Sequence, residues 1–183
     1  MHNYRRLKDR LAEISDLNST ASLLAWDQET YMPPGGGAAR AEQLATLGKV
    51  AHQAFISDEM DSLLGRAAHD VVDQPYDSDE ASLVRVTRRD FDKARRVPSE
   101  LVAEIARATS QGLETWTKAR AESNFASFLP ALQRILELQR TLARCLGYQE
   151  RLYDALLDQY EPGMTVSRLE PLLAQLKTSA PSR

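Results

Sequence analysis

The chain has 183 residues, of which 43% are hydrophobic and 27% charged, and its formal net charge is -3. This composition excludes a disordered chain, and the slightly acidic balance argues against nucleic acid or an anionic membrane as partner. The single cysteine, Cys145, excludes an internal disulfide, and we expect its thiol to be buried. With no signal-peptide pattern and no apolar run that could span a bilayer, we expect one domain over residues 1–183 in the cytoplasm.

Apolar residues recur at intervals of three and four along most of the chain, which predicts amphipathic helices. No segment alternates apolar and polar residues as a strand does, and no repeat of fixed period is present. We therefore predict an all-α bundle of about six helices, several of them long, with helical hairpins such as 77–95 with 98–124. The expected helical segments are 4–24, 44–55, 60–68, 77–95, 98–124, 128–146 and 165–176, and residues 177–183 are expected to be a frayed tail.

The ends of these segments carry capping signals. Ser57 is expected to cap the third helix, and Asp77 is expected to start a capping box that Glu80 completes. Pro98 and Pro130 are each expected in a first helical turn, where a missing N–H is tolerated. We further expect Gly147 at the C-terminal end of its helix, Thr165 as the cap of the last helix, and a compact polar-aromatic connection over 153–163.

Residues 24–37 are the least ordinary stretch, because two prolines and three glycines follow a helical pattern. This composition predicts a helix end followed by a sharp corner. Asp27 and Glu29 are interpreted as helix-end carboxylates, since two acids alone do not make a general acid–base pair. Gly35-Gly36-Gly37 could present amides to an anion, but a plain helix-start linker is favoured.

Other candidate sites are weaker than their structural alternatives. His2, His52 and His69 lie far apart and no H-E-x-x-H is present, which argues against a histidine zinc site. The carboxylates Asp154, Asp158 and Glu161 could hold a hard cation, but helix capping is favoured. The basic residues are interleaved with Asp90 and Asp92, which favours a solvated helix face over nucleic-acid contact; they are Arg85, Arg88, Arg89, Lys93, Arg95 and Arg96. Trp26, Trp116 and the phenylalanines are interpreted as core anchors and not as a ligand cage.

Several stretches together resemble the N-terminal part of the carboxypeptidase Taq family of thermostable zinc metallocarboxypeptidases. The stretches are Leu24–Gly36, Arg40–Leu47, Val97-Pro98 with Trp116 and Ala119-Arg120, Phe128–Pro130 with Leu132, Tyr153–Asp158, and Tyr160–Gly163. The resemblance covers roughly residues 4–177 and departs from the family pattern at Arg151-Leu152, where His-Pro is usual, and at His52-Gln53, where His-Glu is common. It marks as structural signature Trp26, Asp27, Gln28, Glu29, Thr30, Pro33, Pro34, Tyr153, Asp154, Asp158, Glu161, Pro162 and Gly163.

The resemblance implies an all-α fold and a homodimer. The family's zinc ligands, an H-E-x-x-H helix and a further acid, and its substrate-positioning residues have no counterpart in this sequence. No catalytic or metal-binding residue is therefore assigned, and no cofactor is expected for this chain. We predict a short, truncated relative (a pseudoenzyme) that acts by dimerising or by binding a protein partner. The alternatives are a metallocarboxypeptidase that works only with a separately encoded zinc-bearing part, and a nucleic-acid-binding helical module.

Overall fold

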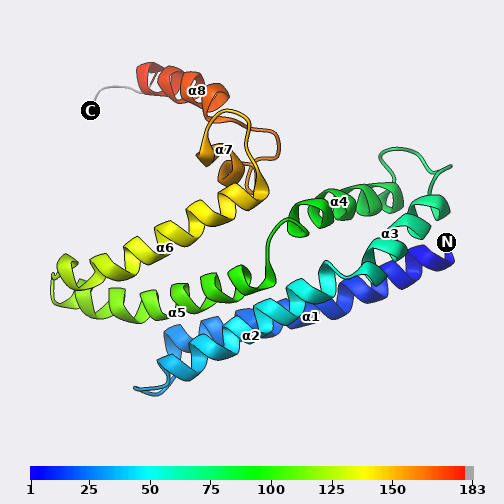
Figure 1. Ribbon diagram of the computed structural model, residues 1–183. Helices are drawn as coiled ribbons and strands as arrows, with labels where there is room; N and C mark the ends of the chain where they lie inside the picture. The colour runs from blue at the N-terminus through cyan, green and yellow to red at the C-terminus, as the bar shows by residue number, and fades with distance from the viewer. Residues whose placement is uncertain (180–183) are drawn as a thin grey trace. The chain divides into compact units, whose positions relative to one another are not determined.

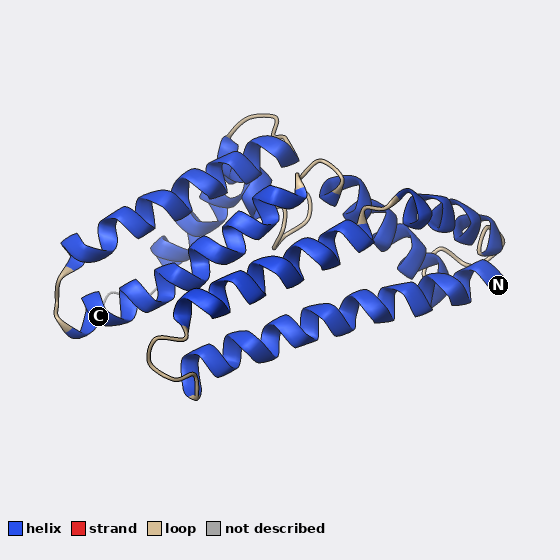
Figure 2. Cartoon of the chain, turned by 60° about the horizontal axis from the view of Figure 1, so that its bottom comes forward, coloured by secondary structure: helices blue, strands red, loops and turns tan. Residues whose placement is uncertain are grey.

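The computed structural model describes residues 1–179, and over these residues it contains eight α-helices and no strand (Figures 1 and 2). The all-α prediction is confirmed, with more helices than the six or so expected. The helices are α1 (His2–Thr30), α2 (Gly37–Phe55), α3 (Asp58–Asp70), α4 (Asp79–Ala94), α5 (Ser99–Ala121), α6 (Phe125–Leu146), α7 (Leu152–Leu157) and α8 (Val166–Ser179). No helix in this part of the chain combines the length and the apolar character needed to cross a bilayer.

The chain divides into two compact units, Met1–Leu138 and a second that begins at Gln139, so the boundary falls within α6. In the first unit α2 packs along both α1 and α5, and α3 packs along α1 and α4 (Figure 1). In the second unit the main contact is between α7 and α8. The expectation of one domain over residues 1–183 stays a prediction.

The core of the first unit lies where α1, α3 and α4 meet. Its largest fully buried side chains are Leu7, Met60, Leu64 and Phe91. Burying each of these stabilises the fold by about 1.5–3 kcal/mol relative to an exposed side chain. The contact of α2 is built differently, because it buries the small side chains Ala41, Ala45 and Ala51. Small side chains permit close approach of helix axes.

The capping predictions are partly confirmed. The Ser57 hydroxyl accepts a hydrogen bond from the Met60 amide at 3.2 Å, and Gly147 follows α6 with a φ of 83°. The expected capping box at Asp77 is wrong, because Ser78 caps α4 and accepts from the Ala81 amide at 3.2 Å. A turn from Pro75 to Ser78 sets this register, in which Ala81, and not Glu80, is the third helical residue.

The expected hairpin of residues 77–95 with 98–124 is not formed. Pro98 adopts an extended backbone immediately before α5, with φ -61° and ψ 138°, and Val97 is buried in the link. The chain leaves α4 in a new direction, and α5 packs along α2. The position expected for Pro130 is also wrong, because α6 begins at Phe125 and places this proline in its second turn.

Three expectations for the second unit need correction. The connection over residues 153–163 contains the short helix α7. Residues 177–179 of the expected frayed tail are helical, whereas residues 180–183 lie outside the described part of the chain. Cys145 is partly exposed where burial was expected. The first correction arises because the buried Asp154 carboxylate organises a compact turn that short-range periodicity does not show.

Candidate functional site

A hydrogen-bonded corner joins the end of α1 to α2. Arg40 of α2 reaches back to α1, where its guanidinium donates to the Leu24 carbonyl and pairs with the Asp27 carboxylate at 2.6 Å. The side chain of Arg40 is only 12% exposed. Bonds from a guanidinium to a carboxylate are about twice as strong as neutral ones. Asp27 therefore fixes the direction in which the chain continues after the corner.

A second set of bonds joins the same helix end to α5. The Gln28 amide donates to the Ser110 carbonyl at 3.1 Å, and the Ser110 hydroxyl donates to the Gln28 side-chain oxygen at 2.9 Å. The Thr30 hydroxyl donates to the Trp26 carbonyl at 2.8 Å, and Glu29 is exposed. These are structural contacts, and they do not place Asp27 and Glu29 as an acid–base pair.

Two of the three glycines after Pro33 and Pro34 form the start of α2, with Gly36 as its N-cap. Gly37 is the first helical residue, and a Cβ at this position would overlap a carboxylate oxygen of Glu114 from α5. The partial positive charge of a helix N-terminus favours a neighbouring carboxylate. The place considered for an external anion is thus next to a carboxylate of the chain itself, which agrees with the favoured linker interpretation.

The carboxylates of the second unit also serve its own backbone. Asp154 is buried and accepts from the Arg151 amide at 3.0 Å and the Val166 amide at 2.8 Å. Asp158 accepts from the Gly163 amide at 2.7 Å. The capping interpretation is therefore confirmed for these two acids. For Glu161, it is the backbone carbonyl that accepts a bond, from the Met164 amide at 2.9 Å.

The neighbouring signature residues have different roles. Tyr153 is exposed, and Pro162-Gly163 form the turn, in which Gly163 has a φ of 82°. Arg151 pairs with Glu170 of α8 at 2.7 Å, so the departure from the family pattern at this position supplies an ion pair. Hydrogen bonding to Glu170 raises the pKa of the Arg151 guanidinium. The Thr165 carbonyl accepts from the amides of Arg168 and Leu169, as expected for the residue before a helix.

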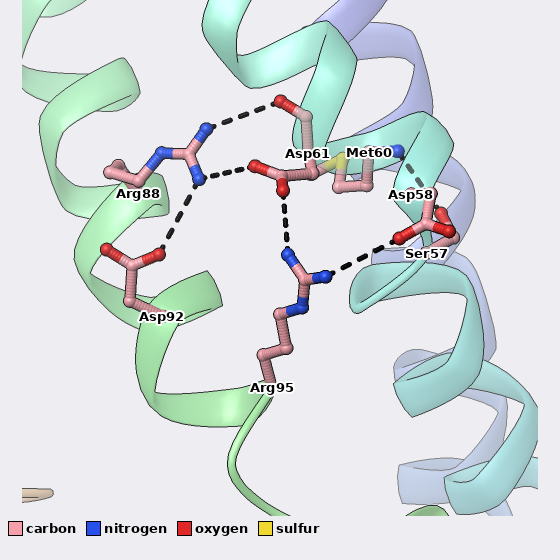
Figure 3. A network of polar contacts seen from close by, with 7 residues as sticks. All are labelled: Ser57, Asp58, Met60, Asp61, Arg88, Asp92 and Arg95. Atoms are coloured by element: carbon pink, nitrogen blue, oxygen red, sulfur yellow. Dashed lines mark hydrogen bonds and ion pairs between the residues drawn. The ribbon is translucent and has the colours of Figure 1, made fainter.

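Two basic residues on or next to α4, Arg88 and Arg95, pair with acids of α3 (Figure 3). Asp61 of α3 forms ion pairs with Arg88 and Arg95, each at 2.7 Å, and Arg88 also pairs with Asp92 at 3.5 Å. The hydrogen bond from Arg88 is the main cause that lowers the pKa of Asp61. The network is a partly exposed bridge between α3 and α4, as expected for a solvated helix face.

The histidines do not form a metal centre. The Nε2 atom of His52 lies 2.8 Å from the Val97 carbonyl oxygen, within hydrogen-bond distance. His2 and His69 are exposed. Within residues 1–179 no three His, Cys, Asp or Glu side chains are grouped so that they could hold a metal ion. Zinc needs three or four converging donors, so this part of the chain does not fit the family's metal.

The prediction that both tryptophans are core anchors is wrong. Trp26 is 53% and Trp116 46% exposed, and Phe125 is 62% exposed, whereas Phe91 is fully buried. Trp116 and Phe125 instead line a cavity of about 330 Å³ at the turn between α5 and α6. Helical spacing shows which residues share a face, but not whether another helix covers that face. The one signal in the sequence was the proximity of Trp116 and Arg120 to two phenylalanines.

Known proteins match nearly the whole chain. The family model for carboxypeptidase Taq (M32) metallopeptidases matches residues 6–181. Thermostable carboxypeptidase 1 of Thermus thermophilus is 36% identical over 95% of this chain and 36% of its own length. Carboxypeptidase 1 of Bacillus subtilis is 31% identical over 97% of this chain and 35% of its own.

Solved structures agree with the sequence matches. A crystal structure of BsuCP superposes with a TM-score of 0.91 and 29% identity over 98% of this chain and 36% of that one. The structure of Pyrococcus furiosus carboxypeptidase superposes with a TM-score of 0.73 and 29% identity, over 97% of this chain and 35% of that one. The chain thus spans about a third of the relatives that it matches. Sequence and fold together show that this chain belongs to the carboxypeptidase Taq (M32) metallopeptidase family.

Proposed function

We propose that this chain is a helical module of the M32 fold that acts by associating with another protein chain, either a second copy or a zinc-bearing part. On this proposal the chain alone does not hydrolyse peptides. The observation that carries the proposal is the number of large apolar side chains left exposed on the first unit. Outside the cavity lined by Trp116 and Phe125, those on its longer helices are Leu23, Trp26, Leu129 and Leu136.

Exposed apolar side chains of this size favour association with another protein surface that buries them. Leu23 and Trp26 lie on the last turns of α1, and Leu129 and Leu136 lie two turns apart on α6. Moving apolar surface out of water contributes about 25 cal/mol per Å², so even part of this surface can support association. Single exposed apolar residues are normal, whereas groups of them on neighbouring elements indicate interaction sites.

The second candidate is metallocarboxypeptidase activity in a complex. Family membership supports it, and the donor arrangement described above requires the zinc ligands to come from another part. The residues of this chain would then supply the helical frame of the complex, with the Asp27–Arg40 corner and the Gln28–Ser110 bonds keeping α1, α2 and α5 in place. No step of hydrolysis is assigned to any residue of this chain.

Sedimentation velocity on the purified chain tests association directly. We expect the sedimentation coefficient to rise with concentration over the micromolar range. Leu23→Glu and Leu136→Glu should each weaken this rise, because a charge in an apolar interface must be desolvated. Val72→Glu is the control, since Val72 is even more exposed, at 73%, but lies in the loop after α3.

Activity assays separate the two candidates. The chain with added zinc or cobalt should release no C-terminal residues from blocked dipeptides. The assay is then repeated after adding the part of the Thermus thermophilus relative that this chain does not match. This second assay tests whether a zinc-bearing part restores turnover. Turnover by the chain alone that a chelator abolishes would contradict the proposal. The proposal would also be contradicted if the chain were a monomer at every concentration and formed no complex with that part of the relative.

A further inference from the structure

The cavity at the α5–α6 turn is not used by the proposed association. Three of its lining residues lie on α5, one lies in the turn and two lie on α6; they are Trp116, Ala119, Arg120, Ser123, Phe125 and Phe128. Its volume of about 330 Å³ is at the lower end of the range of small-molecule pockets. A ligand with one ring and a short chain is therefore of suitable size.

The walls of this cavity are aromatic and incompletely covered. Phe125 meets Phe128 edge to face, with 6.4 Å between ring centroids and an interplanar angle of 70°. Trp116, which is about half exposed, also lines the cavity. A flat apolar group between these rings would remove apolar surface from water and gain favourable ring contacts. The walls thus favour an aromatic ligand.

Arg120 supplies the charge of the cavity. It lies one helical turn after Trp116 and therefore on the same face of α5. The guanidinium groups of Arg107 and Arg134, on the same two helices, both pair with Glu104. By contrast, the guanidinium of Arg120 makes no hydrogen bond or ion pair within residues 1–179. A planar guanidinium of this kind suits a carboxylate, which it can hold with two parallel bonds.

The backbone of the turn does not compete for the same anion. The Ser123 amide donates to the Arg120 carbonyl at 3.3 Å, and the Asn124 amide donates to the Ala119 carbonyl at 2.8 Å. Both amides are satisfied by the end of α5. The polar groups of the lining that remain for a ligand are thus the Arg120 guanidinium and the Ser123 hydroxyl.

We propose that this cavity binds a small aromatic carboxylate. The ring lies between Trp116 and Phe125, and the carboxylate pairs with Arg120. Neither half of the ligand is sufficient, because an anion without a ring leaves the aromatic walls exposed and a neutral aromatic leaves the guanidinium unpaired. The proposal does not depend on the association of the chain with a partner.

The test uses the full chain labelled with ¹⁵N and the two tryptophan indole signals in its NMR spectrum. Trp26→Phe assigns the signals and leaves Trp116 as reporter. We expect 3-phenylpropanoate to shift the Trp116 signal saturably, and neutral 3-phenylpropan-1-ol to bind at least about tenfold more weakly, a factor equivalent to about 1.4 kcal/mol. Arg120→Gln should weaken binding of the carboxylate by a similar factor.

Two variants control this experiment. Arg66→Gln removes an arginine of α3 that is also exposed and should leave the affinity unchanged. Phe125→Ala removes one aromatic wall and should weaken both probes. The proposal is overturned if 3-phenylpropanoate causes no saturable shift, if the alcohol binds equally well, or if Arg120→Gln leaves the affinity unchanged while the amide spectrum shows a folded chain.

Discussion

Ser123 is expected to destabilise the native state, because its φ of 53° is positive. It is the first residue past the cap of α5, where the amides of Ser123 and Asn124 close the helix on the carbonyls of Arg120 and Ala119. This geometry usually has glycine at the left-handed position. Among the described residues other than glycine, Ser123 alone has a positive φ. Ser123→Gly should therefore stabilise the protein.

The size of the effect follows from two opposing terms. A residue with a Cβ in the left-handed region costs roughly 1–2 kcal/mol. Glycine itself lowers the stability by about 0.5–1 kcal/mol, because it loses more backbone entropy on folding than serine does. The expected gain from Ser123→Gly is about 0.5–1 kcal/mol in the free energy of unfolding, measured by urea denaturation with far-UV circular dichroism as readout.

Two comparisons make the test specific to backbone conformation. Ser22→Gly replaces an exposed serine inside α1 and should destabilise by roughly 0.5 kcal/mol, the difference in helix propensity. Ser123→Val should destabilise, because a β-branched residue tolerates positive φ poorly. If Ser123→Gly lowers stability as Ser22→Gly does, the reasoning from φ is refuted.

Two further predictions concern helix packing and pH. Gly65→Ala should stabilise by roughly 0.5–1 kcal/mol, because a Cβ there meets nothing within 4 Å. Gly37→Ala should stabilise less, because the end of the Glu114 side chain must first move away from the new Cβ. Thermal unfolding of both variants checks this, and an equal gain would count against it. Asp61→Asn should lower stability at neutral pH. Arg88 lowers the pKa of Asp61 in the folded state, so the stabilisation is present above the unfolded pKa of about 3.9 and is lost as pH falls below it. Urea denaturation should therefore show the difference between the wild type and the variant shrinking as the pH falls below about 4, and a constant difference would contradict the assignment.

The candidate residues show where local inference succeeds. Asp154 and Asp158 were interpreted as caps from their position beside Pro162-Gly163, and each accepts the expected kind of backbone bond. The corner after Thr30 followed in the same way from its prolines and glycines. Capping and turn chemistry act within a few residues, so they can be read from a short stretch of sequence.

The contacts of that corner could not be predicted in the same way. Arg40 and Ser110 are 13 and 82 residues from their partners Asp27 and Gln28. Nothing in the spacing of these residues indicates that they meet. Their pairing depends on α2 lying against both α1 and α5, which is a property of the assembled first unit.

The sequence by itself determined the all-α class, most helical segments, the caps at Ser57 and Gly147, and the resemblance to the family. Periodicity, capping and turn preferences are local and leave a trace in neighbouring residues. Only the tertiary structure decided that Trp116 is half exposed, that α5 turns away from α4, and that Arg120 borders an aromatic cavity. Burial depends on which helix faces pack together, and that arrangement is set by contacts between residues far apart in the chain.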